Sequence, residues 1–216
     1  MTKPEVIVFT PTVEESRIIV AGLDEVEFDS FSLRVVVTGP GRNNTKTVVE
    51  ETAAPLMAGR EKPLLLIGTG RARPLEGGLK PGETAASGSV FLKDGENKQT
   101  LEASAPLVKA VIDRLAAKGF RPGRILEEGS GQDRFPPECL AADSESAGLA
   151  LAASGLSPEP PWLNLRVAAA ASGADLETED YLEALALKLL VALSTIDRTP
   201  PPSSCSGCRN PCGFLS

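Results

Sequence analysis

Short apolar runs alternate with segments of helical periodicity along most of the chain. The runs cover residues 6–9, 33–37, 64–67, 84–91, 124–128 and 163–168, and we predict that each forms a β-strand. Apolar positions at helical spacing predict helices over 13–19, from about 45 to 57, over 105–118 and over 180–196. Because strands and helices alternate throughout, the expected architecture is an open α/β sandwich.

Residues 141–156 form a further apolar run of small residues that contains just two charges, Asp143 and Glu145. We predict a helix in this run. In one interpretation, Asp143 or Ser144 caps the helix and Glu145 lies in its first turn, where the helix dipole favours a negative side chain. In the other, the helix is buried on all sides, so Glu145 points into a cleft and accepts hydrogen bonds from the hydroxyl groups of a ligand.

Acidic or glycine-rich segments follow the first three predicted strands. Glu14 and Glu15 come at the junction between the first strand and the first helix, where α/β sheets usually place ligands, although the helix dipole alone also favours them there. Segments 38–44 (TGPGRNN) and 68–73 (GTGRAR) are predicted loops whose glycines let backbone N–H groups approach an anion or a sugar. The first segment matches neither a Walker loop nor a dinucleotide fingerprint.

The net charge and the absence of histidine exclude several classes of function. The formal net charge is −7 and the Lys and Arg residues are scattered, which argues against a nucleic acid polymer as a partner. The chain contains no histidine, which removes Ser-His-Asp and Cys-His catalysis and His-ligated zinc. Proton transfer must therefore use Asp, Glu, Lys, Tyr, Cys or water.

We expect the 216 residues of the chain to form one domain with a full-sized core. No apolar run approaches the roughly 20 residues that span a bilayer. The chain also starts directly with a strand-like segment instead of a signal peptide. We therefore expect no membrane partner and a cytoplasmic location.

A tail rich in Pro and Cys, residues 199–216, follows the last predicted helix, so we place the folded domain at residues 1–198. Cys205, Cys208 and Cys212 form a C-x2-C-x3-C pattern, with Cys139 elsewhere as a candidate fourth ligand. Thiolates at this spacing suit an iron–sulfur cluster or zinc, and inside a cell they are more often metal-binding or redox-active than disulfide-bonded. The alternative is a disordered, reactive tail.

Several of these segments, in this order, resemble the nucleoside phosphorylase and nucleosidase superfamily, whose members cleave or exchange the N-glycosidic bond of nucleosides. Residues 38–44 resemble T-G-x-G-x-x-N, residues 68–70 and 79–83 resemble G-T-A-G followed by L-x-x-G-D, and residues 130–135 are similar to S-G-D-x-F with one insertion. Residues 143–147 resemble D-M-E-S-A, and residues 166–167 resemble the start of R-x-x-S-D. The resemblance covers about residues 4–195 and implies a three-layer α/β/α sandwich with a central mixed β-sheet.

The same resemblance implies a nucleoside site. Glu145 would hydrogen-bond the ribose hydroxyls, Phe135 would stack on the base, and Glu14, or alternatively Glu15, would activate the attacking water. The further substrate-binding positions are Asn44, Thr69, Gly70, Ser144 and Arg71. Hydrolysis of a purine-type nucleoside or a futalosine-like intermediate is the expected reaction, since neither Arg71 nor Arg42 matches a phosphate-binding arginine of the family. Catalysis would need no cofactor, and the family implies a homo-oligomer, a dimer or a hexamer.

Two departures from the family pattern keep other functions open. The leaving-group acid of the family is the aspartate of R-x-x-S-D, but Ser172 is followed here by Gly173, and Asp175 substitutes only if the loop is rearranged. Ser144 also replaces a methionine that packs against the sugar. A base that needs no N7 protonation would explain the loss, as would a protein that kept the fold without the reaction. The alternatives are therefore a phosphate-dependent phosphorylase and a non-catalytic nucleoside-binding protein with a metal- or redox-sensing Cys tail.

Overall fold

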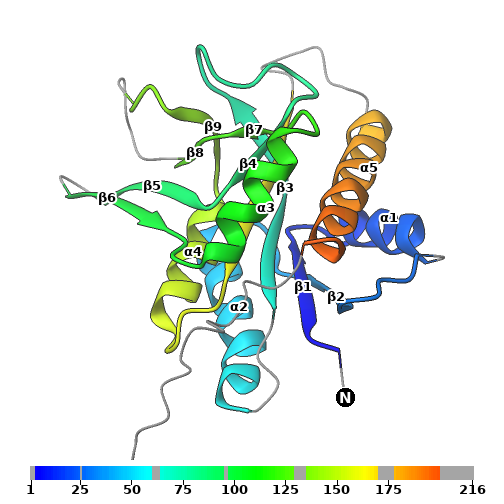
Figure 1. Ribbon diagram of the computed structural model, residues 1–216. Coiled ribbons are helices and arrows are strands. Elements are labelled where there is room, and N and C mark those ends of the chain that lie inside the picture. The colour runs from blue at the N-terminus through cyan, green and yellow to red at the C-terminus, as the bar shows by residue number, and fades with distance from the viewer. Residues whose placement is uncertain are drawn as a thin grey trace, which may run out of the picture.

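A computed structural model describes residues 3–24, 26–59, 64–94, 97–128, 135–169 and 178–199, which form ten strands and five helices (Figure 1). In chain order they are β1 Glu5–Thr10, α1 Val13–Leu23, β2 Ser32–Val37, α2 Arg42–Ala58, β3 Leu65–Pro74, β4 Thr84–Ser87, β5 Ser89–Asp94, β6 Asn97–Glu102, α3 Pro106–Ala116, β7 Arg121–Pro122, β8 Arg124–Glu127, β9 Cys139–Asp143, α4 Ser146–Gly155, β10 Trp162–Ala168 and α5 Thr178–Asp197. None of these helices has the length and apolar character of a membrane span.

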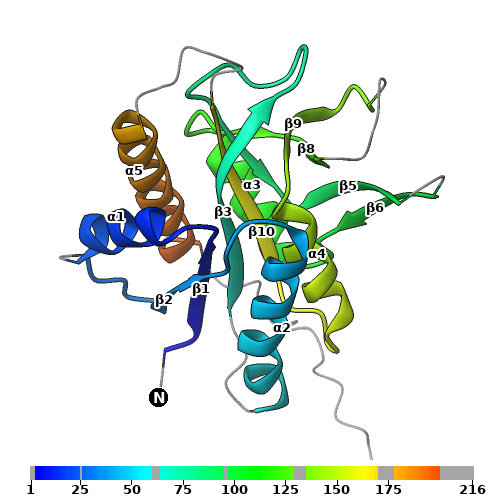
Figure 2. The same cartoon turned by 180° about the vertical axis from the view of Figure 1, so that it is seen from behind.

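The strands form one mixed sheet in which the long strand β3 is central. β1 pairs in parallel with β2 and β3, and β10 pairs in parallel with β3 and antiparallel with β4. Near its carboxyl end β3 pairs antiparallel with β9, which leads through β8 and β5 to β6. Helices α1, α3 and α5 cover one face and α2 and α4 the other, as the two views show (Figure 2). This confirms the predicted three-layer α/β/α sandwich with a mixed sheet.

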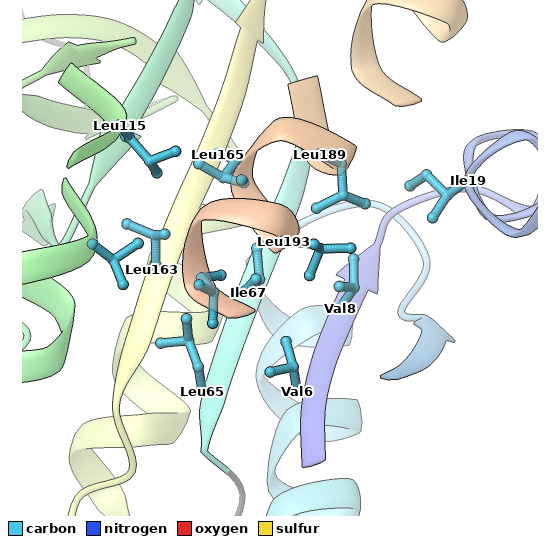
Figure 3. Close-up of a cluster of buried hydrophobic side chains, with 14 of the residues drawn as sticks. Val6, Val8, Ile19, Leu65, Ile67, Leu115, Leu163, Leu165, Leu189 and Leu193 are labelled. Atoms are coloured by element: carbon cyan, nitrogen blue, oxygen red, sulfur yellow. The ribbon is translucent and has the colours of Figure 1, made fainter. Parts of the chain in front are cut away.

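Each face of the central strands buries its own apolar cluster. Val6, Val8 and Ile67 pack toward α1, α3 and α5, together with leucines of β10 and α5 (Figure 3). Ile7 and Leu66 point the other way and pack toward α2 and α4. Neighbouring residues alternate between the clusters because the side-chain period of a strand is two. Since both faces are covered, the central strands read as continuous apolar runs.

The strand predicted over 64–67 continues through residues 68–73, for which the sequence analysis predicts a loop. β3 runs through both glycines, Gly68 and Gly70, as far as Pro74. Side chains of β10 lie across these glycines: a Cβ on Gly68 would be 2.5 Å from Asn164 Oδ1, and one on Gly70 would be 2.9 Å from Arg166 Nη1. The loop prediction was wrong because glycine inside a strand also marks the close approach of other groups.

Three further boundaries differ from the predictions. The strand expected over 84–91 is divided at Gly88 into β4 and β5, and the exposed turn expected over 93–99 is largely replaced by the hairpin of β5 and β6. The helix expected over 141–156 begins only at Ser146, because residues 139–143 form β9. The sequence of β9, CLAAD, has no β-branched residue, so its strand conformation depends on pairing with β8 and β3.

The crossing of α2 and α4 depends on Gly148. A Cβ on this residue would lie 2.4 Å from the carbonyl oxygen of Arg42 and 2.8 Å from Thr45 Cβ. We expect Gly148→Ala to lower the free energy of unfolding by about 1–3 kcal/mol, measured by urea denaturation, because the added methyl group overpacks a fixed backbone contact. Gly155→Ala in the same helix is the matched control, since a Cβ there meets no described atom within 4 Å. Equal losses in the two variants would contradict this account.

Candidate active site

A cavity of about 520 Å³ lies where the carboxyl ends of the central strands meet, as expected for an α/β sheet. The segments after β1, β8 and β9, the ends of β3 and β10 and the start of α5 all contribute to it. Its lining residues are Pro11, Thr12, Glu14, Glu15, Pro40, Arg71, Ala72, Arg73, Glu128, Ala142, Asp143, Ser144, Glu145, Ala169, Tyr181 and Leu182. Most of its charged groups are carboxylates.

A buried ion pair fixes the start of α4 beside this cavity. Asp143 Oδ2 accepts a hydrogen bond from Arg166 Nε at 2.6 Å, and both side chains are almost fully buried. Asp143 Oδ1 accepts from the backbone N–H groups of Glu145 and Ser146, at 2.8 and 2.7 Å. Asp143 therefore satisfies the first amides of α4, as the capping interpretation predicted, although the N-cap residue itself is Glu145. Burial alone would lower the pKa of Arg166, but the charges of Asp143 and Glu145 raise it.

The Glu145 carboxylate is held in the cavity wall by the glycine-rich turn before α2. Its Oε1 accepts hydrogen bonds from the Gly41 backbone N–H at 2.9 Å and from the Ser144 hydroxyl at 2.6 Å. Gly41 has φ +90°, a conformation that favours glycine, so the turn can present this amide. No described residue hydrogen-bonds Oε2, and this oxygen is therefore available to a ligand. The helix behind Glu145 is buried over most of its surface, as the second interpretation predicted.

Glu15 is a second fixed carboxylate, on the segment after β1. The backbone N–H and the hydroxyl of Thr12 donate to Glu15 Oε2 at 3.2 and 3.1 Å, and the Tyr181 hydroxyl donates to Oε1 at 2.6 Å. The guanidinium of Arg71 lies 4.4 Å from the centre of the Tyr181 ring. Glu14, one residue earlier, also lines the cavity but is exposed. The two adjacent glutamates thus differ: Glu15 has a set orientation, and Glu14 is solvated.

Tyr181 is the single tyrosine of the chain, so its ionisation can be followed directly. Burial and the negative charge of Glu15 raise the pKa of its phenol. Above about pH 10 the unfolded chain releases this proton while the folded chain keeps it, so the free energy of unfolding should fall as pH rises. Urea denaturation at about pH 9 and about pH 11 measures the fall. Tyr181→Phe should show a smaller fall, and an identical one would contradict the assignment.

The structure brings together four of the predicted site residues, Glu14, Arg71, Ser144 and Glu145, all of which line the cavity. Asn44 lies in an adjoining depression that shares Pro40, Glu128 and Ser144 with the cavity. There its side-chain amide donates to the Pro40 carbonyl at 2.9 Å and closes the turn before α2. Asn44 therefore shapes the wall beside Ser144.

Other predicted residues lie away from the cavity lining. Thr69 and Gly70 are inside β3. Thr69 is buried, and Gly70 leaves room for the guanidinium of Arg166. Phe135 is half-buried and packs against an apolar cluster. Its stacking on a base remains a prediction, as do the substrate contacts of Thr69 and Gly70. Asp175 lies outside the described residues.

The structure adds Tyr181, the Arg73–Glu128 pair at 3.1 Å and the Arg166–Asp143 pair, which the sequence analysis did not assign to the site. Tyr181 lies next to Leu182 at the start of the apolar stripe of α5, and the sequence analysis did not single it out. Its hydroxyl group could have indicated a polar partner near the site, because a buried Tyr usually has a hydrogen-bond partner.

Within the part of the chain that the structure describes, no group of three or more Cys, Asp or Glu side chains is arranged to hold a metal ion. Burial raises the pKa of the Cys139 thiol to about 11, with a further contribution from the charge of Glu138. Cys139 is buried in β9, and its role as a fourth ligand remains a prediction. Cys205, Cys208 and Cys212 lie outside the described residues, so metal binding by the tail and the domain boundary at residue 198 remain predictions.

Comparison with protein-family models finds no match, and neither does comparison with curated protein sequences. Solved structures do match. An S-adenosylhomocysteine nucleosidase from Streptococcus pyogenes is similar with TM-score 0.69 and 18% identity, covering 93% of this chain and 99% of that one. A 5'-methylthioadenosine/S-adenosylhomocysteine nucleosidase from S. pneumoniae is similar with TM-score 0.66 and 18% identity, and the match covers 89% of this chain and 98% of that one. The 5'-methylthioadenosine nucleosidase of Arabidopsis thaliana is similar with TM-score 0.66 and 14% identity, and the match covers 93% of this chain and 98% of that one. At these identities the likeness is one of fold.

Proposed function

We propose that this chain, which has the fold of the nucleoside phosphorylases and nucleosidases, is an N-ribosyl hydrolase that cleaves the glycosidic bond of a purine-type nucleoside or a futalosine-like intermediate. The observation that carries the proposal is that Glu145, Glu14 and Glu15 line one cavity. Its volume of about 520 Å³ is in the range of small-molecule sites. One carboxylate can hold the sugar there while another activates water.

Glu145 is proposed to bind the ribose. Because the Gly41 amide and the Ser144 hydroxyl both engage Oε1, the carboxylate has a fixed orientation. A ribose hydroxyl that donates to Oε2 would form a charge-assisted hydrogen bond, which is about twice as strong as a neutral one. The same negative charge stabilises the ribosyl cation that develops as the glycosidic bond breaks.

Glu15 is proposed to activate the water, with Glu14 as the alternative. Sequence resemblance placed Glu14 first, but the contacts of Thr12 and Tyr181 fix Glu15, whereas Glu14 is exposed. A carboxylate oxygen has two lone pairs, so Oε1 can accept from both Tyr181 and a water. In the reaction the C1'–N bond breaks and its electron pair leaves with the base. The water oxygen bonds to C1' and its proton passes to Glu15.

Glu145→Gln is expected to weaken nucleoside binding about 10- to 150-fold in calorimetry, since a hydrogen bond to a charged group contributes about 1.5–3 kcal/mol. Glu128→Gln is the matched control. Its carboxylate also lines the cavity but already pairs with Arg73 in a half-exposed position, so its loss should change the affinity little. Unchanged affinity in Glu145→Gln would remove its ribose role.

Phosphorolysis is the second candidate reaction, and one observation favours it. Arg71 lines the cavity and has no carboxylate partner among the described residues, whereas Arg42 is paired with Glu127 at 2.8 Å. Release of free base from inosine, methylthioadenosine, futalosine and uridine, with and without phosphate, separates the two. Release without phosphate supports hydrolysis, and release that requires phosphate supports phosphorolysis. No release from any of these four, nor from a nucleoside whose base carries a positive charge, would leave the non-catalytic, nucleoside-binding role with a sensing Cys tail.

The assembly and location of the enzyme belong to the same proposal. By analogy with the family that the sequence resembles, we propose a homo-oligomer, a dimer or a hexamer, that acts in the cytoplasm. Sedimentation of the full chain tests the first of these: a monomer at micromolar concentration would contradict it.

A further inference from the structure

The described cavity lining has an excess of negative charge. Two of its carboxylates are neutralised, Asp143 by Arg166 and Glu128 by Arg73. The remaining three, Glu14, Glu15 and Glu145, face a single further cation, Arg71, whose guanidinium lies over the Tyr181 ring. The described lining, together with Arg166, therefore has an excess of two negative charges, which favours a cationic ligand.

The same lining offers a leaving group no acidic proton. Each of its hydroxyl groups donates to one of the protein's own carboxylates: Thr12 and Tyr181 to Glu15, and Ser144 to Glu145. Burial and the charge of Glu15 raise the pKa of Tyr181, so this phenol keeps its proton. Guanidinium groups are not deprotonated in proteins. The described residues thus bind a sugar and stabilise a cation, but they do not protonate a departing base.

A neutral purine departs as an anion unless it is protonated, and general acid catalysis of such a step contributes about 100- to 10,000-fold. A base with a quaternary ring nitrogen needs no proton. When its C1'–N bond breaks, the electron pair stays on the ring and cancels the positive charge, so the base departs neutral. Water bonds to C1', and its proton passes to the carboxylate of Glu15. The positive charge moves from base to ribose without leaving the acidic cavity.

We infer that the substrates of this site are nucleosides whose base already carries a positive charge, such as N7-alkylated purine nucleosides or N-ribosylpyridinium compounds. This inference rests on the proposed nucleosidase function and specifies its substrate class. It combines two features of the cavity: carboxylates that form no ion pair with any described residue, and hydroxyl groups that donate to these carboxylates.

The test compares kcat/KM for 7-methylguanosine and for guanosine with the full chain in phosphate-free buffer. The two substrates differ by one methyl group and one charge. The methylated nucleoside is expected to react at least about 100-fold more efficiently, because the described residues of the cavity offer no proton to the departing base of guanosine. A smaller ratio, with guanosine cleaved, would overturn the inference and identify an acid outside the described residues. If neither these two nor any nucleoside of the panel is cleaved, the nucleosidase function itself fails.

Discussion

Glu15→Gln is expected to lower kcat about 100- to 10,000-fold, the usual contribution of a general base. The glutamine keeps the size of the side chain and an oxygen that can accept from Tyr181. Its amide NH2 group then faces Thr12, whose hydroxyl can accept a hydrogen bond from it, so KM should change little. The loss arises because the amide cannot take the proton of the attacking water. Steady-state release of free base from a cleaved nucleoside, with circular dichroism to confirm folding, measures the effect.

Glu14→Gln is the matched control, since the two glutamates are adjacent in the chain and line the same cavity. Glu14 is exposed, and none of the described residues forms an ion pair with it, so its replacement should lower kcat less than about tenfold. If Glu14→Gln abolished activity while Glu15→Gln kept it, the order of assignment from sequence resemblance would be correct and the geometric argument for Glu15 would be wrong.

Arg166→Met is expected to lower the free energy of unfolding by about 3–5 kcal/mol. The variant removes one partner of a buried ion pair and leaves the Asp143 carboxylate without its counter-charge in the core. The backbone amides of Glu145 and Ser146 still donate to Asp143, but they do not replace a full positive charge. The shift of the urea midpoint at an unchanged m-value measures the loss.

Arg73→Met tests whether burial of the ion pair is the reason for the large loss of stability expected in Arg166→Met. The Arg73–Glu128 pair borders the same cavity, but both side chains are about half exposed, so breaking it should cost less than about 1 kcal/mol. Similar losses from Arg166→Met and Arg73→Met would contradict the view that the Asp143–Arg166 pair is the structural anchor of the site.

Local signals in the sequence predicted the fold and several of the residues that line the cavity. Charges in an otherwise apolar run must be satisfied or used, and hydrogen bonds within the protein satisfy both Asp143 and Glu145, which also line the cavity. The glycines at 39 and 41 also predicted a turn whose amide approaches an anion, and that anion is the Glu145 carboxylate. These signals are local in the chain, so they can be read without coordinates.

The features that the sequence analysis did not predict depend on contacts between segments that are distant in the chain. The extension of β3 through Gly68 and Gly70 is explained by side chains of β10, about a hundred residues away, and β9 is a strand because of its neighbours. The burial of Glu15 had a local signal that was missed. It lies four and eight residues before Ile19 and Leu23, on the buried face of α1. Its partner Tyr181 comes from the other end of the chain.

The most direct test of the proposed function is the rate of free base release from a purine-type nucleoside in phosphate-free buffer, for the wild type and Glu145→Gln side by side. We expect release by the wild type without phosphate, and a value of kcat/KM at least about tenfold lower in the variant, since the ribose loses its charged partner. Release that requires phosphate, or hydrolysis that Glu145→Gln leaves unchanged, would contradict the assignment of this cavity as a nucleosidase site.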